Sequence, residues 1–312
     1  MNTSRALRIA VTSDIHWEVS RTAAERRAFI GALAETLTAA EPDVVLLAGD
    51  AGNGPRSVRE ALSHLAVGRL ANLFVPGNHD VWLTDRERDD GVDTSFAALD
   101  ALAEACAATG FRYLPGDPVV VGGVGFAGSC GWYDYTFRSP EVPANFADYR
   151  AKAWGGSQNQ DGWYVRWEER GSRLDDGEVA DRMLAQLGAD LARLGLDEDG
   201  GGPPTVAATH MLPFRALASY RGPSDWGWDF NSAFFGSEGL GRLYDGLPAV
   251  RAIVAGHTHT PFAVRDGWER EIVVSPMGYA GGPEFPAGLA ERVTVLLAGD
   301  GFIVREEAST EG

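Results

Sequence analysis

Cysteine, lysine and long apolar runs are nearly absent from this sequence. The 312 residues include two cysteines, Cys106 and Cys130, which are too few for a disulfide framework and indicate a reducing compartment. Residues 9–11 form only a short apolar run near the N-terminus, so no signal peptide is expected. No stretch of about 18 apolar residues is present to span a bilayer. These absences predict a cytoplasmic protein that does not bind membranes.

Positive charge is also scarce. Lys152 is the single lysine, and 27 basic residues stand against 44 acidic ones, which gives a formal net charge of −17 and a pI near 4.7. Proteins that bind nucleic acid usually present a basic face to the phosphate backbone. We therefore expect a small phosphorylated substrate and no long nucleic acid. The sequence leaves the oligomeric state open. The hydrophobic fraction of 45% allows a sizeable core, and a single domain over 1–312 is the simplest organisation.

Strand patterns alternate with helical patterns over the first third of the chain. A capping box at Thr22 and Glu25 precedes apolar residues at helical spacing, and Ser57 and Glu60 resemble a second capping box. Open α/β sheets bind ligands at the carboxyl ends of their strands, so the residues that follow each strand are candidates for a site. Strands are expected at 8–13, 44–47, 73–75, 119–121, 124–127, 205–208, 250–254, 272–275 and 293–297.

Residues 131–177 have no clear periodicity but are too rich in aromatic side chains to be a disordered linker. We expect this segment to form a cap beside the site. Two interpretations remain open. The aromatic residues form either a local core or a wall for the substrate, and in the second case a nearby cation would bind a further anionic group. The candidate cations are Arg138, Arg150, Lys152 and Arg166, and Trp226, Trp228 and Asn231 of a second aromatic loop could face the same cleft.

Five of the six histidines directly follow apolar strands, and so do two aspartates and one asparagine. Imidazole, carboxylate and carboxamide groups without thiolates suit divalent ions such as Mn, Fe, Zn, Co or Mg. Eight such groups are too many for one ion. Two-metal sites, with ions roughly 3.5–4 Å apart, serve in-line displacement at phosphorus. The residues are Asp14, His16, Asp50, Asn78, His79, His210, His257 and His259.

These motifs resemble the signature of calcineurin-like metallophosphoesterases. The blocks occur in the order of that family: Asp14-x-His16, Gly49-Asp50, Gly77-Asn78-His79-Asp80, His210 and Gly256-His257-Thr258-His259. The resemblance extends from about residue 7 to about residue 298. It implies an α/β fold, a four-layer αββα sandwich with two central mixed β-sheets. Here the sandwich would carry the aromatic cap insertion at about 131–177.

The resemblance also implies a role for each residue. Asp14, His16 and His259 would hold a first divalent metal ion, and Asn78, His210 and His257 a second. Asp50 would bridge the two ions. His79 would contact the phosphate and the leaving group, and Asp80 would orient His79. In the purple acid phosphatase branch a tyrosine ligand stands three residues after the bridging aspartate, but Asn53 occupies that position here. We therefore expect a pair of Mn, Fe(II) or Zn ions.

A dinuclear phosphoester hydrolase is the function that these residues favour. A water shared by two divalent ions loses a proton near neutral pH and can attack phosphorus in line, opposite the leaving oxygen. The substrate is expected to be a small phosphodiester or phosphomonoester. A nuclease is the alternative among enzymes. A catalytically silent scaffold of the same fold, which binds partner proteins, is the alternative from another class, although all eight polar residues are present.

Overall fold

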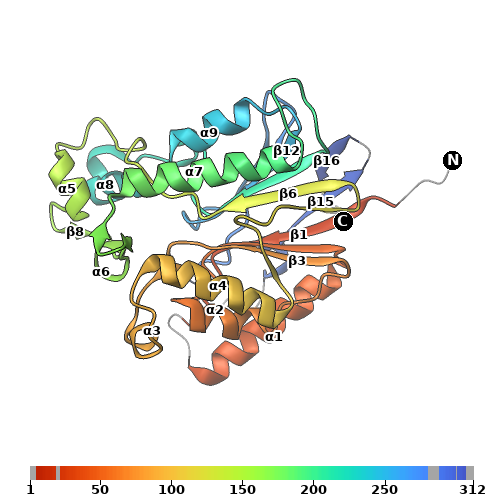
Figure 1. Ribbon diagram of the computed structural model, residues 1–312, viewed down its shortest axis with the longest axis horizontal. Coiled ribbons are helices and arrows are strands. Elements are labelled where there is room, and N and C mark those ends of the chain that lie inside the picture. The colour runs from red at the N-terminus through yellow and green to blue at the C-terminus, as the bar shows by residue number, and fades with distance from the viewer. Residues whose placement is uncertain (1–4, 19–21, 280–287, 300, 307–312) are drawn as a thin grey trace.

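The computed structural model consists of two β-sheets that face each other, with helices on both outer sides (Figure 1). It describes residues 5–18, 22–279, 288–299 and 301–306. Each of the two main sheets has six strands, and two further two-stranded sheets lie in the 131–177 segment. No helix in these described ranges combines the length and the apolar character that a membrane crossing needs.

The first sheet is mixed. Its strands β1 to β4 run parallel to one another, β15 pairs with β1 in antiparallel orientation, and β16 pairs with β15 in antiparallel orientation. The strand order is β16 (Phe302–Arg305), β15 (Thr294–Gly299), β1 (Leu7–Thr12), β2 (Val44–Ala48), β3 (Ala71–Val75) and β4 (Arg112–Tyr113).

The second sheet is also mixed. The strands β6, β11, β12 and β14 are parallel, whereas β5 and β13 close the two edges as antiparallel partners. The sequence pattern did not predict β13, because all four of its side chains are exposed and show no alternation. The strand order is β13 (Phe262–Arg265), β14 (Glu271–Val274), β12 (Val250–Ala255), β11 (Thr205–Thr209), β6 (Val124–Ser129) and β5 (Val119–Val121).

The period-two alternation of the strands builds two kinds of core. Ile9 and Val11 of β1 point between the sheets, where they pack with Val206 of β11, whereas Ala10 lies in the core on the helix side. Helices cover the outer faces, with α1 (Ala23–Ala39), α2 (Pro55–Leu62) and α4 (Ser95–Thr109) on the first sheet and α7 (Asp176–Arg193) and α9 (Glu238–Asp245) on the second. The expected αββα sandwich is therefore confirmed.

The helix starts were predicted correctly at α1 but not at α2. Thr22 and Glu25 form the expected capping box of α1. By contrast, α2 begins at Pro55, and the Ser57–Glu60 box is wrong. Proline fits the first helical turn because its missing N–H has no partner there in any case. Ser57 is instead buried inside the helix, where its hydroxyl accepts a hydrogen bond of 2.9 Å from the indole Nε1 of Trp17.

The 131–177 segment folds into short elements at one end of the sandwich, beside α8 (Trp226–Asn231) (Figure 1). Most of its aromatic side chains are buried against one another; Tyr149, for example, stacks on Phe230 of α8 with ring centroids 5.1 Å apart. This favours the interpretation as a local aromatic core. The elements are α5 (Phe146–Ala151), β7 (Ala153–Trp154), β8 (Ser157–Gln158), α6 (Asp161–Tyr164), β9 (Glu168–Glu169) and β10 (Ser172–Arg173).

Short helices complete the described chain. The 3-10 helix η1 (His79–Val81) follows β3 directly and so begins within one of the sequence motifs. The others are α3 (Asp85–Asp89), η2 (Arg215–Leu217), η3 (Gly222–Ser224), η4 (Ser232–Phe234) and η5 (Ala290–Arg292).

Candidate metal centre

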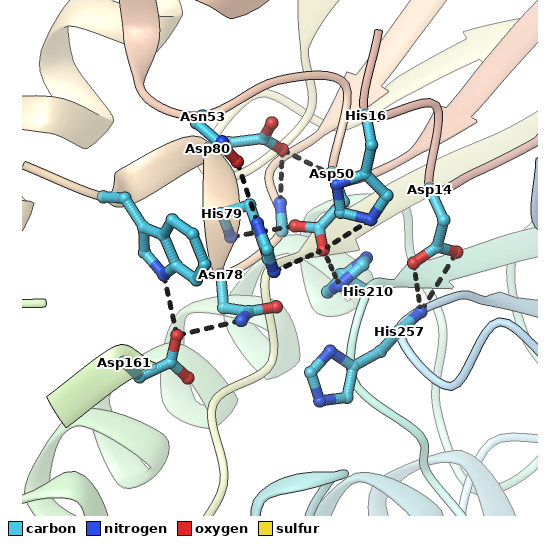
Figure 2. Close-up of polar contacts among 12 residues, drawn as sticks. Asp14, His16, Asp50, Asn53, Asn78, His79, Asp80, Asp161, His210 and His257 are labelled. Carbon is cyan, nitrogen blue, oxygen red and sulfur yellow. Dashed lines mark hydrogen bonds and ion pairs between the residues drawn. The ribbon is translucent and has the colours of Figure 1, made fainter. Parts of the chain in front are cut away.

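Five loops, each of which follows a parallel strand of one of the two sheets, bring the eight polar residues together. Figure 2 labels all of them except His259. The strands are β1, β2 and β3 of the first sheet and β11 and β12 of the second, and their carboxyl ends point to the same end of the sandwich. Within this cluster the histidine and carboxylate ligands form three overlapping groups whose donor atoms lie within 4.8 Å of one another. The groups are Asp14, His16 and His259; His16, Asp50 and His79; and Asp50, His210 and His257.

The first group lies between the two sheets. The Nε2 atoms of His16 and His259 are 3.0 Å apart, and His259 Nε2 is 3.3 Å from Asp14 Oδ1. The backbone N–H of His257 donates to both oxygens of Asp14, at 2.9 and 3.1 Å, and so fixes the carboxylate. Two imidazole nitrogens and a carboxylate oxygen that converge in this way suit a single divalent cation.

Asp50 connects the group that contains Asp14 to the group that contains His210. Its Oδ2 atom lies 3.2 Å from His210 Nε2 and 3.6 Å from His16 Nε2, so one carboxylate oxygen reaches both sides. The other oxygen, Oδ1, accepts the backbone N–H of His79 at 2.9 Å. The position of Asp50 therefore matches the bridging role that the resemblance implies.

Two buried polar atoms test whether the residues fit a metal ion. Asn78 Oδ1 has no hydrogen-bond partner among the described residues, and His210 Nε2 lies 3.2 Å from Asp50 Oδ2. The Nδ1–H of His210 donates to the carbonyl of Ala48 at 2.9 Å, which leaves Nε2 directed at Asp50 and the centre. A buried acceptor without a partner costs free energy, so a cation would satisfy Asn78 Oδ1, and it could also bind His210 Nε2. The donor set therefore fits a second divalent ion.

Five of the residues in the cluster have left-handed backbone conformations. Such conformations are uncommon outside glycine, and they recur at functional sites because the surrounding fold holds them. Here they turn each side chain back toward the centre directly after a strand. The residues and their φ angles are Asp14 (52°), His16 (41°), Asp50 (55°), His257 (74°) and His259 (53°).

The glycines of the motifs give the ligands room. A Cβ atom on Gly77 would lie 2.1 Å from Asp50 Oδ1, and one on Gly49 would lie 2.5 Å from His210 Nδ1. Gly49 also has a φ angle of 86°. Only glycine fits at these two positions without displacing a ligand.

His79 stands at the rim of the centre, and the asparagine three residues after Asp50 contacts it. His79 Nδ1 lies 2.9 Å from Asn53 Oδ1, and the imidazole stacks on Trp82 with ring centroids 3.6 Å apart. The other nitrogen, Nε2, is 3.9 Å from Asp50 Oδ2 and 3.5 Å from the hydroxyl of Tyr279. His79 thus presents Nε2 next to the metal ligands.

The expectation that Asp80 orients His79 is wrong. Asp80 Oδ2 accepts the backbone N–H groups of Asp50 and Gly77, at 2.8 and 2.7 Å, and Oδ1 accepts that of Gly52 at 3.1 Å. The carboxylate therefore fixes the turn that carries Asp50, while Asn53 holds His79. Burial, followed by the charge of Asp50, raises the pKa of Asp80 well above its usual value.

Burial and mutual charge set the protonation of the ligands. Burial alone would raise the pKa of Asp14, but the hydrogen bond from His259 and the charge of His210 hold it at about 2. Burial lowers the pKa of His16 to about 3, that of His257 to about 3 and that of His79 to about 4. Near neutral pH these three imidazoles are therefore neutral, and for His16 and His257 this is the form that would bind metal.

The pKa of His210 shifts in the direction opposite to that of these three histidines. Burial would lower its pKa, but the neighbouring charge of Asp50 outweighs burial and raises it to about 10. The same pairing holds the pKa of Asp50 well below its usual value, although burial opposes this. A divalent cation between them would take the place of that proton.

A cleft of about 410 Å³ opens onto the centre. None of the four cations considered in the 131–177 segment lines it: Lys152 pairs with Asp176, and Arg138 stacks on Phe146. Among the described residues its lining contains no lysine or arginine, and Trp228 and Asn231 line it but Trp226 does not. The lining residues are Asp50, Asn78, His79, Trp82, Gln158, Asn159, Gln160, Asp161, Asp225, Trp228, Asn231, Phe235, His257, Thr258, His259 and Tyr279.

Sequence reasoning missed three residues that support the site: Asn53, Trp82 and Asp161. Asp161 lies in the aperiodic 131–177 segment, and its Oδ1 accepts hydrogen bonds from Asn78 Nδ2 at 2.9 Å and from Trp82 Nε1 at 2.8 Å (Figure 2). Burial raises the pKa of Asp161, while the hydrogen bond from Asn78 acts against this shift. No periodic or spacing signal in the sequence singles out this aspartate.

Comparisons with known proteins identify the family and support the fold. A family model described as calcineurin-like phosphoesterase matches residues 7–261. A phosphopantetheinyl hydrolase (PptH) from Mycobacterium tuberculosis has a similar structure, with a TM-score of 0.66 and 19% identity over 91% of this chain and 99% of that one. A dimetal phosphatase from Danio rerio has a TM-score of 0.54 and 13% identity over 97% of this chain and 96% of that one. No curated protein matches the sequence.

Proposed function

The chain belongs to the calcineurin-like phosphoesterase family and is a metal-dependent phosphoesterase, and from this premise we propose that it hydrolyses a small phosphomonoester or phosphodiester. One observation carries the proposal. Asp50 Oδ2 lies 3.6 Å from His16 Nε2 of one ligand group and 3.2 Å from His210 Nε2 of the other, and the buried Asn78 Oδ1 has no hydrogen-bond partner among the described residues. This arrangement suits two divalent ions, for which we propose Mn, Fe or Zn.

The metal ions and His79 have separate tasks in this proposal. When bound, two divalent ions supply the Lewis acidity that makes water a nucleophile at neutral pH and offsets charge on the phosphate oxygens. His79 presents Nε2 beside Asp50 and is the proposed proton donor to the leaving oxygen. A phosphate in front of Nε2 adds negative charge, which favours the imidazolium form despite burial. Asn53 Oδ1 then accepts a hydrogen bond from the Nδ1–H and keeps the ring in place.

The cleft supports a substrate with one phosphate and a neutral or cationic remainder. Beyond the metal ligands, the described lining offers carboxamide side chains at Gln158, Asn159, Gln160 and Asn231 and aromatic faces at Trp228 and Phe235. Its acidic rim residue Asp225 is paired with Arg221 at 2.7 Å. A second anionic group would find no cation in this lining. The small volume and the net charge of −17 argue against long nucleic acids.

The cellular location and the domain organisation form part of the same proposal. Cys106 and Cys130 are both unpaired and buried, which suits a reducing, cytoplasmic compartment. Burial raises the pKa of Cys106 to about 12, so its thiol is unreactive. We retain the prediction of one domain over 1–312.

A substrate panel with matched pairs tests the proposal. Protein loaded with Mn, Fe or Zn is assayed on phosphoesters that differ only in whether the leaving alcohol carries a neutral amide or a carboxylate. Phosphopantetheine-type esters belong in the panel because their tail carries neutral amides. We expect kcat/KM to favour the neutral member by about tenfold or more. The carboxylate of the other member would be buried in the cleft without a cationic partner, which costs free energy. Equal rates for the pair would contradict the neutral-tail specificity.

The two alternative functions give different results in the same panel. A nuclease would cleave oligonucleotides at rates that fall steeply as salt is added. A silent scaffold would show no turnover with any of the three metals. Either result would overturn the proposed small-molecule hydrolase.

A further inference from the structure

We propose that Asp161 is a positioning residue that orients the carboxamide of Asn78 so that its oxygen faces the second metal ion. The inference rests on the proposed dinuclear site. Asp161 begins α6 in the 131–177 segment, 83 residues after Asn78, and its side chain is 1% exposed. Its Oδ1 atom accepts a hydrogen bond of 2.9 Å from Asn78 Nδ2.

The chemistry of the two groups determines which end of the carboxamide faces the centre. A carboxylate is only an acceptor, so it can pair with the NH₂ of Asn78 but not with its oxygen. Pairing at Nδ2 turns Oδ1 to the opposite side, where it is buried without a hydrogen-bond partner among the described residues. A reversed carboxamide would place two oxygens against each other and would aim a donor at the cation. Asp161 thus selects the ligand atom before a metal ion binds.

The same carboxylate also holds the ring that supports His79. Asp161 Oδ1 accepts a second bond of 2.8 Å from Trp82 Nε1, and Trp82 stacks on His79. The other oxygen accepts a bond of 3.1 Å from the hydroxyl of Tyr133. One side chain of the 131–177 segment therefore contacts a metal ligand and the partner of the proposed proton donor.

A purely structural role predicts something different. If Asp161 only anchored its own segment through Tyr133, its loss would lower stability but would leave the affinity for the second metal unchanged. Variants that remove individual hydrogen bonds of Asp161 distinguish the positioning role from the anchoring role. Tyr133→Phe removes the anchoring bond and keeps the bond to Asn78, whereas Asp161→Leu removes all three bonds of the carboxylate and keeps the branching of the side chain. Asp161→Asn keeps an oxygen for Asn78 and Trp82 and can direct its NH₂ to the Tyr133 oxygen.

The test measures metal binding to the full chain. Protein freed of metal is titrated with Mn²⁺ or Zn²⁺ by calorimetry, and bound metal is counted by elemental analysis. We expect Asp161→Leu to lower the affinity of one of the two ions by about 10-fold to 100-fold, the usual cost of losing a partner of a metal ligand. Asp161→Asn and Tyr133→Phe should stay within about threefold of the wild type, because both keep the acceptor for Asn78.

A double-mutant comparison shows whether Asp161 acts through Asn78. In an Asn78→Ala background, Asp161→Leu should cause no further loss of affinity, since there is no carboxamide left to orient. An additive loss would overturn the inference. Unchanged binding of two ions by folded Asp161→Leu would also overturn it.

If Asp161→Leu does not fold, Asp161→Ser replaces it, because the serine hydroxyl is too short to reach Asn78, and the same loss is expected. Failure of the wild type to bind two ions would instead contradict the proposed function.

Discussion

His79 and Asn53 form a pair across the centre's rim, with Nδ1 of the imidazole 2.9 Å from the carboxamide oxygen. A carboxamide is neutral, so it orients the ring without stabilising an imidazolium as a carboxylate would. Burial lowers the pKa of His79 to about 4, although the nearby charge of Asp50 opposes this shift. The charge of a bound phosphate would add to that of Asp50 in favouring a protonated His79, which links proton donation to the presence of substrate.

Replacing Asn53 by aspartate should change the pH dependence of turnover. The added carboxylate beside Nδ1 favours the charged imidazole, so in Asn53→Asp the pKa of His79 should rise by about one unit or more. If protonated His79 is the acid, kcat should persist to higher pH than in the wild type. The measurement is the alkaline limb of the kcat–pH profile on a substrate with a poor leaving group. An alkaline limb at the same pH, with two metal ions still bound, would show that His79 does not supply the proton.

Removing His79 should slow the reaction without emptying the site. In His79→Ala the ligands Asp14, His16, Asp50, Asn78, His210, His257 and His259 all remain, so elemental analysis should still find two metal ions. Turnover should fall by about 100-fold, the usual contribution of a general acid. The loss should be much smaller on a substrate with a good leaving group such as p-nitrophenolate, which needs little protonation. Equal losses on both substrates would contradict the role as proton donor.

Adding one methyl group at Gly77 should disrupt the bridging carboxylate. The Cβ of Gly77→Ala would lie 2.1 Å from Asp50 Oδ1 and 2.6 Å from the backbone nitrogen of Asp50, so Asp50 must move. Because Asp50 contacts both ligand groups, we expect metal content to fall at both positions. Gly31→Ala in α1 is the matched control, since nothing lies within 4 Å of its added methyl group. Gly31→Ala should keep both ions and gain up to about 1 kcal/mol in stability. Full metal content in Gly77→Ala would refute the need for glycine there.

The sequence predicted those parts of the fold that depend on local repetition. The continuous apolar run of Ile9, Ala10 and Val11 indicates a strand buried on both faces, and the two cores on either side of β1 confirm it. The cluster was predictable for a related reason, since polar groups after buried strands meet where the parallel strands end. By contrast, the pattern at Ser57 and Glu60 satisfies the rule for a helix start, yet the helix begins at Pro55. The hydroxyl of Ser57 accepts a hydrogen bond from the indole of Trp17 instead of capping the helix.

Contacts between side chains of aperiodic segments were not predictable. Asp80 is adjacent to His79 in the sequence, but the tight turn directs its carboxylate to backbone N–H groups and leaves Asn53 to hold the ring. Asp161 reaches Asn78 only because the aromatic core of the 131–177 segment fixes the start of α6. Both relationships depend on the three-dimensional path of loops, which no spacing rule describes.

The low pKa of His79 should be visible in the stability of protein treated with a chelator. As pH falls from about 6.5 to about 4, the unfolded chain protonates this histidine while the folded protein does not. The wild type should therefore lose stability relative to His79→Gln across this window, by up to about 1.4 kcal/mol per pH unit. Between pH 7 and 8, where His79 is neutral in both states, the difference should be constant. The measurement is the free energy of unfolding in urea at several pH values.

Other buried groups do not obscure this comparison. Asp80, with its raised pKa, stabilises the folded state at low pH and so acts in the opposite direction, but it is present in both proteins and largely cancels in the difference. The stabilisation from His210, whose pKa is about 10, is fully present below about pH 6.5 and is lost progressively as pH rises from there through about 10, so it adds no slope between pH 6.5 and 4. A stability difference that stays flat from pH 7 to pH 4 would therefore mean that folding does not lower the pKa of His79.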